Sequence, residues 1–285
     1  MTLTVLEAGP FTTVQDLGRP GFAHIGVPHS GALDRGALTL ANRLLGNDEG
    51  AAALEITVGG FEARTDADVW VAVTGAWCPI TVNGEPADPN EAVRVRAGQA
   101  LRVAAAEHGL RAYLAVRGGV DADVVLGSRS HDVLSGLGPE PLAAGDEVRV
   151  GSIPPAPIPA LEIAPWSPPT DGRVEVAVTR GPRDDWFPDA ALEAFFDTTW
   201  LVGAASNRVG ARLTGDPLMR DAGDELPSEG MVAGSIQVPP SGQPTVLLAD
   251  HPVTGGYPVL AVVASEDLDV FAQVRPGQAV EFRHA

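Results

Sequence analysis

The sequence predicts a mainly β protein with few helices, in which two halves repeat one strand-rich unit. Short Val-rich runs bounded by turn residues recur along the chain, and only two stretches have the pattern of a helix. The 33 glycines and 25 prolines are spread along the chain rather than clustered. Many short strands separated by turn residues, with few helices, are typical of β-barrels and β-sandwiches.

The strands are predicted from short apolar runs that lie between glycines, prolines and polar turn residues. They cover residues 69–73, 100–104, 113–116, 174–178, 245–249 and 259–263. A first helix is predicted over residues 32–45, because Leu38, Ala41 and Leu45 share one face and Gly46-Asn47 follows as a stop signal. A second helix is predicted over residues 189–198, directly after Pro188.

The densest run of prolines lies in the middle of the chain. Residues 151–172 contain seven prolines, a density that favours an extended connector over a packed strand. We therefore predict an N-terminal domain at residues 1–150, a proline-rich linker at residues 151–172 and a C-terminal domain at residues 173–285.

The two predicted domains open with the same order of features. Residues 3–10 and residues 174–182 both run as a strand into Gly-Pro, and each is followed by an acidic turn, a helix and a strand. Such a repeat predicts the duplication of one β-rich unit. Because ligand sites often lie between domains, a cleft between the two halves is the expected place for a site.

The charge of the chain limits its partners. With 19 basic and 37 acidic residues, the formal net charge is −18. A surface of that sign repels nucleic acid and anionic membranes, so we expect neither as a partner. All the basic residues are arginines. Without lysine, this chain has no P-loop lysine, no Schiff-base lysine and no lysine to carry biotin, so we expect no covalently bound cofactor.

Cysteine, histidine and the apolar runs also limit the possible functions. Cys78 lies in an apolar run and is expected to be a small buried hydrophobic residue. The histidines show no i, i+4 or His-x-His spacing, so we predict no metal site. The first residues lack the pattern of a signal peptide, and no apolar run reaches the length of about 18 residues that a membrane span needs. A cytoplasmic protein is therefore expected.

A glycine-rich segment at residues 12–34 leads into the first predicted helix and carries several polar side chains. Ser30 is a candidate helix cap, and the N–H groups at the helix start are suited to binding an anion. The alternative is a network of turns held together by Gln15, Asp16 and Arg19.

Two further places in the first half carry polar groups. Glu55 lies in an apolar run, so it either faces solvent or holds a partner inside a cleft. Ser128 and Arg129 belong to a Gly-Ser-Arg-Ser cluster, which is suited to binding a carboxylate or phosphate but equally typical of a solvated loop.

In the second half, polar residues alternate with glycine at residues 227–239 and 249–258. One interpretation is that these side chains converge on a small polar ligand, and the other is that they tie loops to strand ends. The side chains concerned are Glu229, Gln237, Asp250 and Tyr257.

These segments resemble the signatures of one family. The clearest are Thr-Val-Gln-Asp-Leu-Gly-Arg at residues 13–19, Gly-Val-Pro-His-Ser-Gly-Ala-Leu-Asp at residues 26–34 and Ala-Asn-Arg-Leu-Leu-Gly-Asn at residues 41–47. Further matches lie at residues 54–57, 126–130, 181–187, 228–230, 236–239 and 254–258. In this order, and over nearly its whole length, the chain resembles the allophanate hydrolase subunit 2 family, also described as biotin-dependent carboxyltransferase-like.

The resemblance implies two cyclophilin-like β-barrel domains related by pseudo-two-fold symmetry, in agreement with the repeat. It also implies a homologous subunit 1 (KipI-like) partner. His131 stands where the family is expected to have Thr after Ser-Arg-Ser, and His251-Pro252-Val253 replaces an Arg-Gln-Thr-like stretch. These departures concern substrate specificity rather than the fold.

Stand-alone members of this size resemble the C subunit of a bacterial ATP-dependent 5-oxoprolinase. With a subunit 1 homologue and a LamB/YcsF-type protein, that enzyme opens the lactam of 5-oxo-L-proline to give L-glutamate. The alternatives are the carboxyltransferase part of a urea carboxylase and a non-catalytic regulator that antagonises a kinase inhibitor. The absence of lysine for biotin attachment favours the 5-oxoprolinase, in which we expect ATP to be used by the complex and this chain to be inactive alone.

The resemblance also suggests roles for individual residues. Arg19 and Arg129 are predicted to bind a carboxylate or a phosphorylated lactam. Glu55 or Asp250 is predicted to be the catalytic group that orients water. The predicted substrate-binding residues are Gln15, Arg19, Ser30, Asp34, Ser128, Arg129, Glu229, Gln237, Thr254 and Tyr257.

Overall fold

The computed structural model describes residues 1–160, 167–221 and 226–285. The chain forms two compact units. Unit 1 consists of Met1–Arg19, Asp34–Asp132 and Gly136–Pro169, and unit 2 consists of Pro20–Leu33, Val133–Ser135 and Thr170–Ala285. Two short segments of the predicted first domain are thus part of unit 2.

The boundary between the units lies between Pro169 and Thr170, inside the stretch that is predicted as a linker. The start of that stretch packs on unit 1. The guanidinium of Arg117 donates to the carbonyl oxygens of Leu45 at 2.6 Å and Pro154 at 3.1 Å, and also to that of Ala156. Residues 161–166 of the predicted linker lie outside the described residues.

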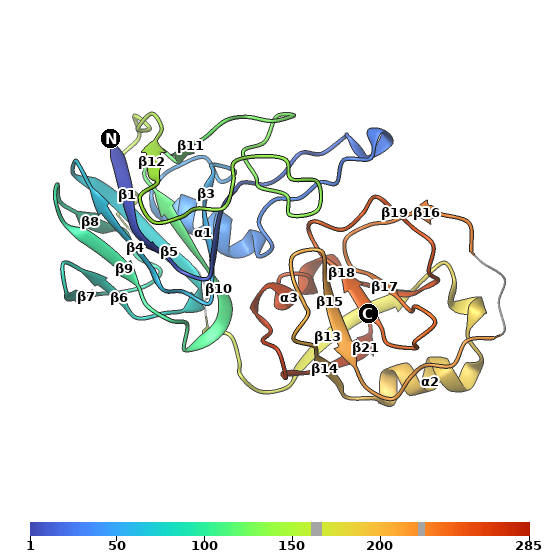
Figure 1. Cartoon of the computed structure of the whole chain (residues 1–285). Coiled ribbons are helices and arrows are strands. Elements are labelled where there is room, and N and C mark those ends of the chain that lie inside the picture. The colour runs from blue at the N-terminus through green and yellow to red at the C-terminus, as the bar shows by residue number, and fades with distance from the viewer. Residues whose placement is uncertain (161–166, 222–225) are drawn as a thin grey trace. The chain divides into compact units, whose positions relative to one another are not determined.

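Unit 1 contains two sheets that share one apolar core (Figure 1). The first has the order β11-β12-β1-β4-β9-β6-β7 and the second the order β2-β3-β10-β5-β8. The strands of the first sheet are β1 (Thr2–Ala8), β4 (Phe61–Thr65), β6 (Ile80–Val82), β7 (Glu85–Ala87), β9 (Ala100–Val103), β11 (Val120–Asp121) and β12 (Glu147–Val150). Those of the second are β2 (Phe11–Gln15), β3 (Ala53–Thr57), β5 (Val69–Trp77), β8 (Val93–Val95) and β10 (His108–Val116).

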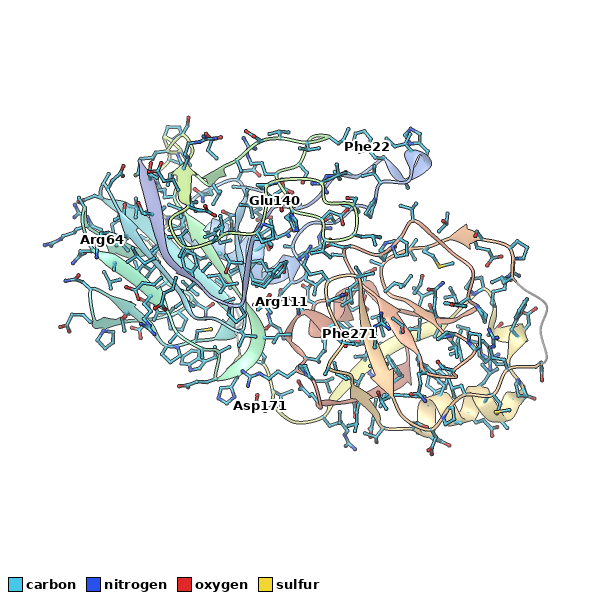
Figure 2. The ribbon with its side chains drawn as sticks, viewed as in Figure 1. Phe22, Arg64, Arg111, Glu140, Asp171 and Phe271 are labelled. Atoms are coloured by element: carbon cyan, nitrogen blue, oxygen red, sulfur yellow. The ribbon has the colours of Figure 1, made fainter. Side chains whose placement is uncertain are left out.

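The strands of unit 1 turn alternate residues toward the shared apolar core. Side chains alternate between the faces of a strand, so residues two apart point the same way. In the first sheet, Ala63 lies in the core while the next residue, Arg64, is exposed (Figure 2). In the second sheet, Val14, Leu54 and Leu114 lie in the core. Their neighbours in sequence therefore lie on the opposite face of that sheet, which holds the polar residues described below.

The Gly-Pro turns of the predicted repeat have a common physical cause. Gly9 follows β1 with a φ of 68°, and a Cβ there would lie 2.3 Å from the carbonyl oxygen of Gly59. A Cβ on Gly181 would likewise lie 2.3 Å from the carbonyl oxygen of Val259. Glycine is required at both turns because the backbones approach so closely.

Unit 2 is built around a closed barrel of the order β13-β20-β17-β18-β15-β14-β21. Its strands are β13 (Val174–Arg180), β14 (Trp200–Val202), β15 (Gly210–Thr214), β17 (Ser235–Gln237), β18 (Thr245–Leu247), β20 (Val259–Val263) and β21 (Ala279–His284). The barrel closes because β13 pairs antiparallel with β20 and parallel with β21. A two-stranded sheet of β16 (Glu229–Gly230) and β19 (Thr254–Gly255) accompanies it.

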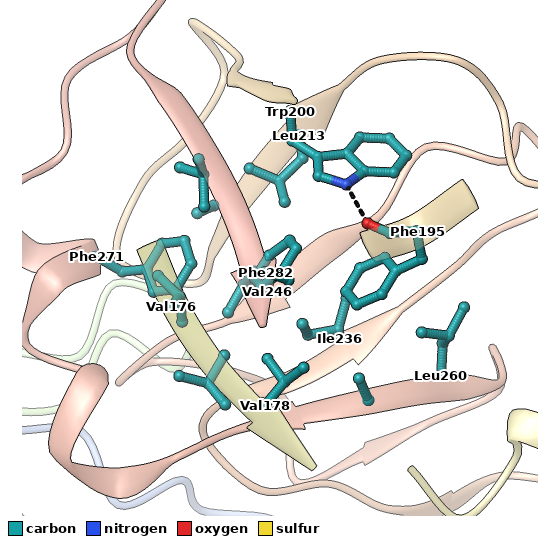
Figure 3. Packing of buried hydrophobic residues seen from close by; sticks show 14 of the residues in the cluster. Val176, Val178, Phe195, Trp200, Leu213, Ile236, Val246, Leu260, Phe271 and Phe282 are labelled. Carbon is teal, nitrogen blue, oxygen red and sulfur yellow. Dashed lines mark hydrogen bonds between the residues drawn. The ribbon is translucent and has the colours of Figure 1, made fainter. Parts of the chain in front are cut away.

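The core of unit 2 is rich in aromatic side chains (Figure 3). The rings of Phe195 and Phe282 stack with centroids 4.6 Å apart, and the indole N–H of Trp200 donates to the carbonyl oxygen of Phe195 at 3.0 Å. Leu33, at the end of Pro20–Leu33, belongs to the same core. Burial of this side chain is one reason why the segment is part of unit 2.

The described residues form three α-helices and three short 3₁₀ turns. The helices are α1 (Arg35–Leu44), α2 (Asp189–Asp197) and α3 (Val270–Gln273), and the turns are Ala23–Ile25, Asp184–Trp186 and Ser265–Asp267. The helix α1 begins three residues later than predicted because Asp34, rather than Ser30, caps it. The four-residue α3 is not predicted from the sequence, since it is too short to show a helical period.

The predicted mainly β class with few helices is confirmed, and the second half is a closed barrel as expected. The prediction of one barrel in the first half differs from the structure, where the described strands form two separate sheets. The cyclophilin-like character and the pseudo-two-fold relation stay predictions. Cys78 is buried, as predicted. Among the described residues, no helix has the length and apolar character needed to cross a membrane.

Candidate functional site

The polar face of the second sheet in unit 1 carries a row of buried polar residues. Thr13 of β2 lies opposite Glu55 of β3, Glu55 opposite Tyr113 of β10, and Tyr113 opposite Thr74 of β5. Directly opposed side chains in a sheet are about 5 Å apart, so the four form one continuous row. All are at most 1% exposed.

Glu55 is the charged member of this row, and it faces the protein interior rather than solvent. The Tyr113 hydroxyl donates to Glu55 Oε2 at 2.7 Å. Arg111, two residues before Tyr113 in β10, places its Nε 3.6 Å from Glu55 Oε1. Of the two alternatives left open by the sequence, the structure therefore selects a carboxylate that holds partners.

The Tyr113 hydroxyl is held from both sides. It accepts the backbone N–H of Asp34 at 2.7 Å while it donates to Glu55. Burial raises the pKa of Tyr113 well above its usual value of 10.0, and the negative charges of Glu55 and Asp34 raise it further. The phenol consequently stays protonated near neutral pH and remains a hydrogen-bond donor.

Gln15 is the last residue of β2, lies on the same face of the strand as Thr13 and is fully buried. Its Nε2 donates to Thr13 Oγ1 at 3.1 Å and to the carbonyl oxygen of His131 at 2.9 Å. Within the described part of the chain, its Oε1 is buried without a hydrogen-bond partner. A buried amide oxygen of this kind is costly unless a water or a ligand donates to it, so it marks a place for a donor group.

Asp34 fixes the start of α1 beside this row. Its Oδ1 accepts the backbone N–H of Ala37 at 2.7 Å, which is the hydrogen bond of an N-cap. Thr74 Oγ1 donates to the carbonyl oxygen of Ala37 at 2.7 Å. The first turn of α1 is thus attached to the polar face of the sheet, and the prediction that Ser30 caps the helix is wrong.

Asp16 organises the loops around the Gly-Ser-Arg-Ser cluster. Its Oδ1 accepts the hydroxyls of Ser128 and Ser130, each at 2.6 Å, and the N–H of Gly18 at 2.7 Å. Its Oδ2 accepts the backbone N–H of Arg129 at 2.6 Å. The turn network foreseen as the alternative for this segment therefore exists, and Ser128, at 1% exposure, is part of it.

The two arginines predicted to grip substrate differ in their surroundings. Arg19 is 1% exposed and donates to the carbonyl oxygens of Val125 and Ser130. The side chain of Arg129 is 38% exposed, and its guanidinium lies 3.7 Å from Asp121. Arg129 is accessible to an anionic group, whereas these two hydrogen bonds of Arg19 hold the loops of unit 1.

Asp250, the other predicted catalytic residue, lies in unit 2 in a fully buried ion pair. Its two oxygens accept Arg208 Nε at 2.8 Å and Arg208 Nη2 at 2.9 Å. They also accept Ser30 Oγ at 2.6 Å and the N–H of Val133 at 3.1 Å. Four donors fill the acceptor positions of a carboxylate. These hydrogen bonds connect Asp250 and Ser30 to the surrounding loops of unit 2.

The remaining predicted residues gather beside the small β16–β19 sheet of unit 2. Glu229 accepts both Nε and Nη2 of Arg183 and lies opposite Gly255 in the sheet. Gln237 Nε2 donates to the carbonyl oxygen of Tyr257 at 3.3 Å. Thr254 and Tyr257 are exposed. The structure thus brings these four residues together, with Thr254 and Tyr257 at the surface and Gln237 buried.

The two histidines that depart from the family pattern are both buried. His131 Nδ1 lies 2.9 Å from the carbonyl oxygen of Pro139, and His251 Nδ1 lies 2.8 Å from that of Pro252. Across the residues that the structure describes, no three His, Cys, Asp or Glu side chains are grouped so that they could hold a metal ion.

Tyr113, Arg111 and Arg208 are site residues that the sequence-based predictions do not include. Tyr113 is predicted only as part of a strand, although its period-two alternation with Arg111 places both on one face and could have revealed the pair. Nothing local marks Arg208, because its partner Asp250 is distant in sequence.

The chain is thus a mainly β protein that carries a buried carboxylate network on one sheet. The family model "Carboxyltransferase domain, subdomain A and B" matches residues 25–284, and the chain belongs to this family. The resemblance seen in the sequence is therefore confirmed.

Several known proteins are similar to this chain over nearly its whole length. The C subunit of the 5-oxoprolinase of Escherichia coli is 38% identical over 285 residues, covering 98% of this chain and 90% of the relative. The corresponding 5-oxoprolinase C subunit of Haemophilus influenzae is 34% identical, with the same coverage of both chains. The crystal structure of the urea amidolyase of Kluyveromyces lactis matches with a TM-score of 0.93 at 33% identity, covering 99% of this chain but 18% of that one.

Proposed function

We propose that this chain is the C subunit of an ATP-dependent 5-oxoprolinase that hydrolyses 5-oxo-L-proline to L-glutamate. The observation that carries the proposal is the similarity to proteins of that name over 98% of this chain and 90% of theirs. The urea amidolyase shares the fold, but this chain spans only 18% of its length. The identity of 38% to the 5-oxoprolinase C subunit of Escherichia coli, against 33% to the urea amidolyase, favours the 5-oxoprolinase.

In the proposed complex, the partners are a subunit 1 (KipI-like) homologue and a LamB/YcsF-type protein. ATP is used by the complex, and this chain, which has no lysine, leaves part of the phosphate binding to its partners. The requirement for ATP and for partner subunits supports a cytoplasmic location.

We propose that Glu55 is the catalytic carboxylate. Lactam hydrolysis needs a base that takes a proton from the attacking water. Glu55 lies on the polar face with Arg111 and Tyr113 as partners, near the unpaired amide oxygen of Gln15. For the substrate carboxylate or a phosphorylated intermediate we propose Arg129, whose side chain is 38% exposed.

Reconstitution tests the proposed function. The purified chain mixed with both partners, ATP and 5-oxoproline should release glutamate, and omission of any one protein should stop the release. The matched control replaces the partners by a biotin carboxylase with a biotin carrier and supplies urea and bicarbonate. Carboxylation of urea in that control, without glutamate release in the first mixture, would replace the proposal by the carboxyltransferase function.

A further inference from the structure

Tyr113 and Glu55 form the centre of a hydrogen-bonded chain that runs from the sheet to a helix. The chain begins at the Glu55 carboxylate, passes through the Tyr113 hydroxyl and ends at the backbone N–H of Asp34, with both hydrogen bonds 2.7 Å long. Asp34 caps α1, so the chain connects β3, β10 and the amino terminus of α1. Such a chain leaves the carboxylate little freedom to rotate.

We propose that Tyr113 is a positioning residue, whose hydroxyl fixes the Glu55 carboxylate against the start of α1 and favours its charged form. A hydrogen bond donated to a carboxylate favours the ionised state. The catalytic part of this inference rests on the proposed function, because Tyr113 would act on the reaction through Glu55. The effect of Tyr113 on the Glu55 carboxylate is a property of the folded chain and does not depend on the substrate.

The other groups around Glu55 define what Tyr113 contributes. The positively charged guanidinium of Arg111, in β10, lies 3.6 Å from Glu55 Oε1. The Tyr113 hydroxyl donates a hydrogen bond to Glu55 Oε2. Thr13 and Gln15 of β2 are neutral. The Asp34 carboxylate, at the start of α1, accepts the backbone N–H of Ala37 as the helix cap. The buried residues of α1 itself are uncharged: Ala37, Leu38, Ala41, Asn42 and Leu44. Tyr113 is therefore the neutral donor on one oxygen, and Arg111 is the cation near the other.

Removal of one hydroxyl tests the inference. In Tyr113→Phe the ring stays, the donor to Glu55 is lost, and the charged carboxylate becomes less favoured. The Glu55 titration midpoint should consequently rise by about one pH unit or more. The measurement is a carbon-13 NMR titration of the glutamate carboxyls in the isolated full-length chain, with the Glu55 signal assigned by its loss in Glu55→Gln.

The chain offers a matched control, because it contains only two tyrosines. Tyr257 lies in unit 2 and is 47% exposed, so Tyr257→Phe should leave the Glu55 midpoint unchanged. If Tyr113→Phe fails to fold, incorporation of 3-fluorotyrosine gives the opposite perturbation in an intact hydrogen bond. The more acidic fluorophenol is a stronger donor and should lower the Glu55 midpoint.

The reconstituted complex supplies the catalytic readout. The acid limb of its pH–rate profile should move upward in Tyr113→Phe by the same amount as the Glu55 midpoint. A shifted midpoint with no 5-oxoproline hydrolysis by the wild-type complex would overturn the proposed function and keep Tyr113 as the positioning group. Hydrolysis by the wild-type complex, with a Glu55 midpoint that neither substitution nor fluorination moves, would overturn the role of Tyr113.

Discussion

Arg19 and Arg129 illustrate at the residue scale how one residue type takes two roles in neighbouring loops. The guanidinium of Arg19 donates to backbone carbonyls in the interior of unit 1, whereas the side chain of Arg129 is partly exposed. Because a buried carbonyl that loses its donor is left unsatisfied, the two residues should respond differently to truncation.

Arg19→Ala should lower the free energy of unfolding by about 3 kcal/mol, because the carbonyls of Val125 and Ser130 lose a charged donor. Arg129→Ala is the matched control. Its backbone N–H still bonds Asp16, so stability should be little changed, while substrate binding by the complex weakens. Urea denaturation and KM measurements separate the two effects. If Arg19→Ala unfolds like the wild type and yet abolishes turnover, then Arg19 grips substrate after all.

The sequence locates these loops but not their partners. The motif at residues 13–19 and the Gly-Ser-Arg-Ser cluster at residues 127–130 are each recognisable as polar, glycine-rich segments. That Asp16 accepts from Ser128 and Ser130 is a contact across more than a hundred residues, which local spacing does not encode. The ion pair of Asp250 with Arg208 is likewise a contact between separate loops, which local spacing does not encode.

At the element scale, α1 shows how a cap fixes a boundary. The sequence predicts its start at residue 32, where Ala-Leu continues the apolar pattern, but the helix begins at Arg35. Asp34 takes an extended backbone conformation and bonds the N–H of Ala37, which ends the preceding loop. The strands are predicted more closely, because Val-rich runs in two-sided buried sheets carry a strong apolar signal; β20 has the predicted bounds, residues 259–263.

Substitution of the cap tests this account of α1. Asp34→Ala removes the acceptor for the Ala37 N–H and should lower the free energy of unfolding by about 1 kcal/mol. Asp34→Asn keeps an acceptor oxygen at the same place and should lose much less. The backbone N–H that bonds Tyr113 is unaffected by either change. Equal losses in the two variants, measured by urea denaturation, would show that the negative charge of Asp34 rather than its cap hydrogen bond stabilises α1.

At the scale of the whole molecule, the chain crosses between its units more than once. Pro20–Leu33 and Val133–Ser135 belong to unit 2, although the sequence around them belongs to unit 1. Within unit 2, Asp250 and Arg208 hold both segments, through Ser30, Gly31 and Val133. Domain boundaries inferred from composition miss such exchanges, because the linker is marked by proline but the crossing segments are short.

The family motifs are distributed over both units of the molecule. The motifs at residues 13–19, 54–57 and 126–130 build the polar face of the second sheet and the loops around Asp16. Those at residues 228–230 and 254–258 build the small sheet of unit 2. The fold and the family follow from the order of these motifs. The choice among catalytic residues depends on burial and partners, which only the structure supplies.

The proposal that Glu55 is the catalytic carboxylate is tested most directly by glutamate release from the reconstituted complex containing Glu55→Gln. Glutamine preserves the size of the side chain, and its amide oxygen can still accept from the Tyr113 hydroxyl, but it does not take a proton from water. We expect an assembled complex with the same elution volume as the wild type and a kcat that is lower by about 100-fold or more. A Glu55→Gln complex that releases glutamate at the wild-type rate would contradict the proposal.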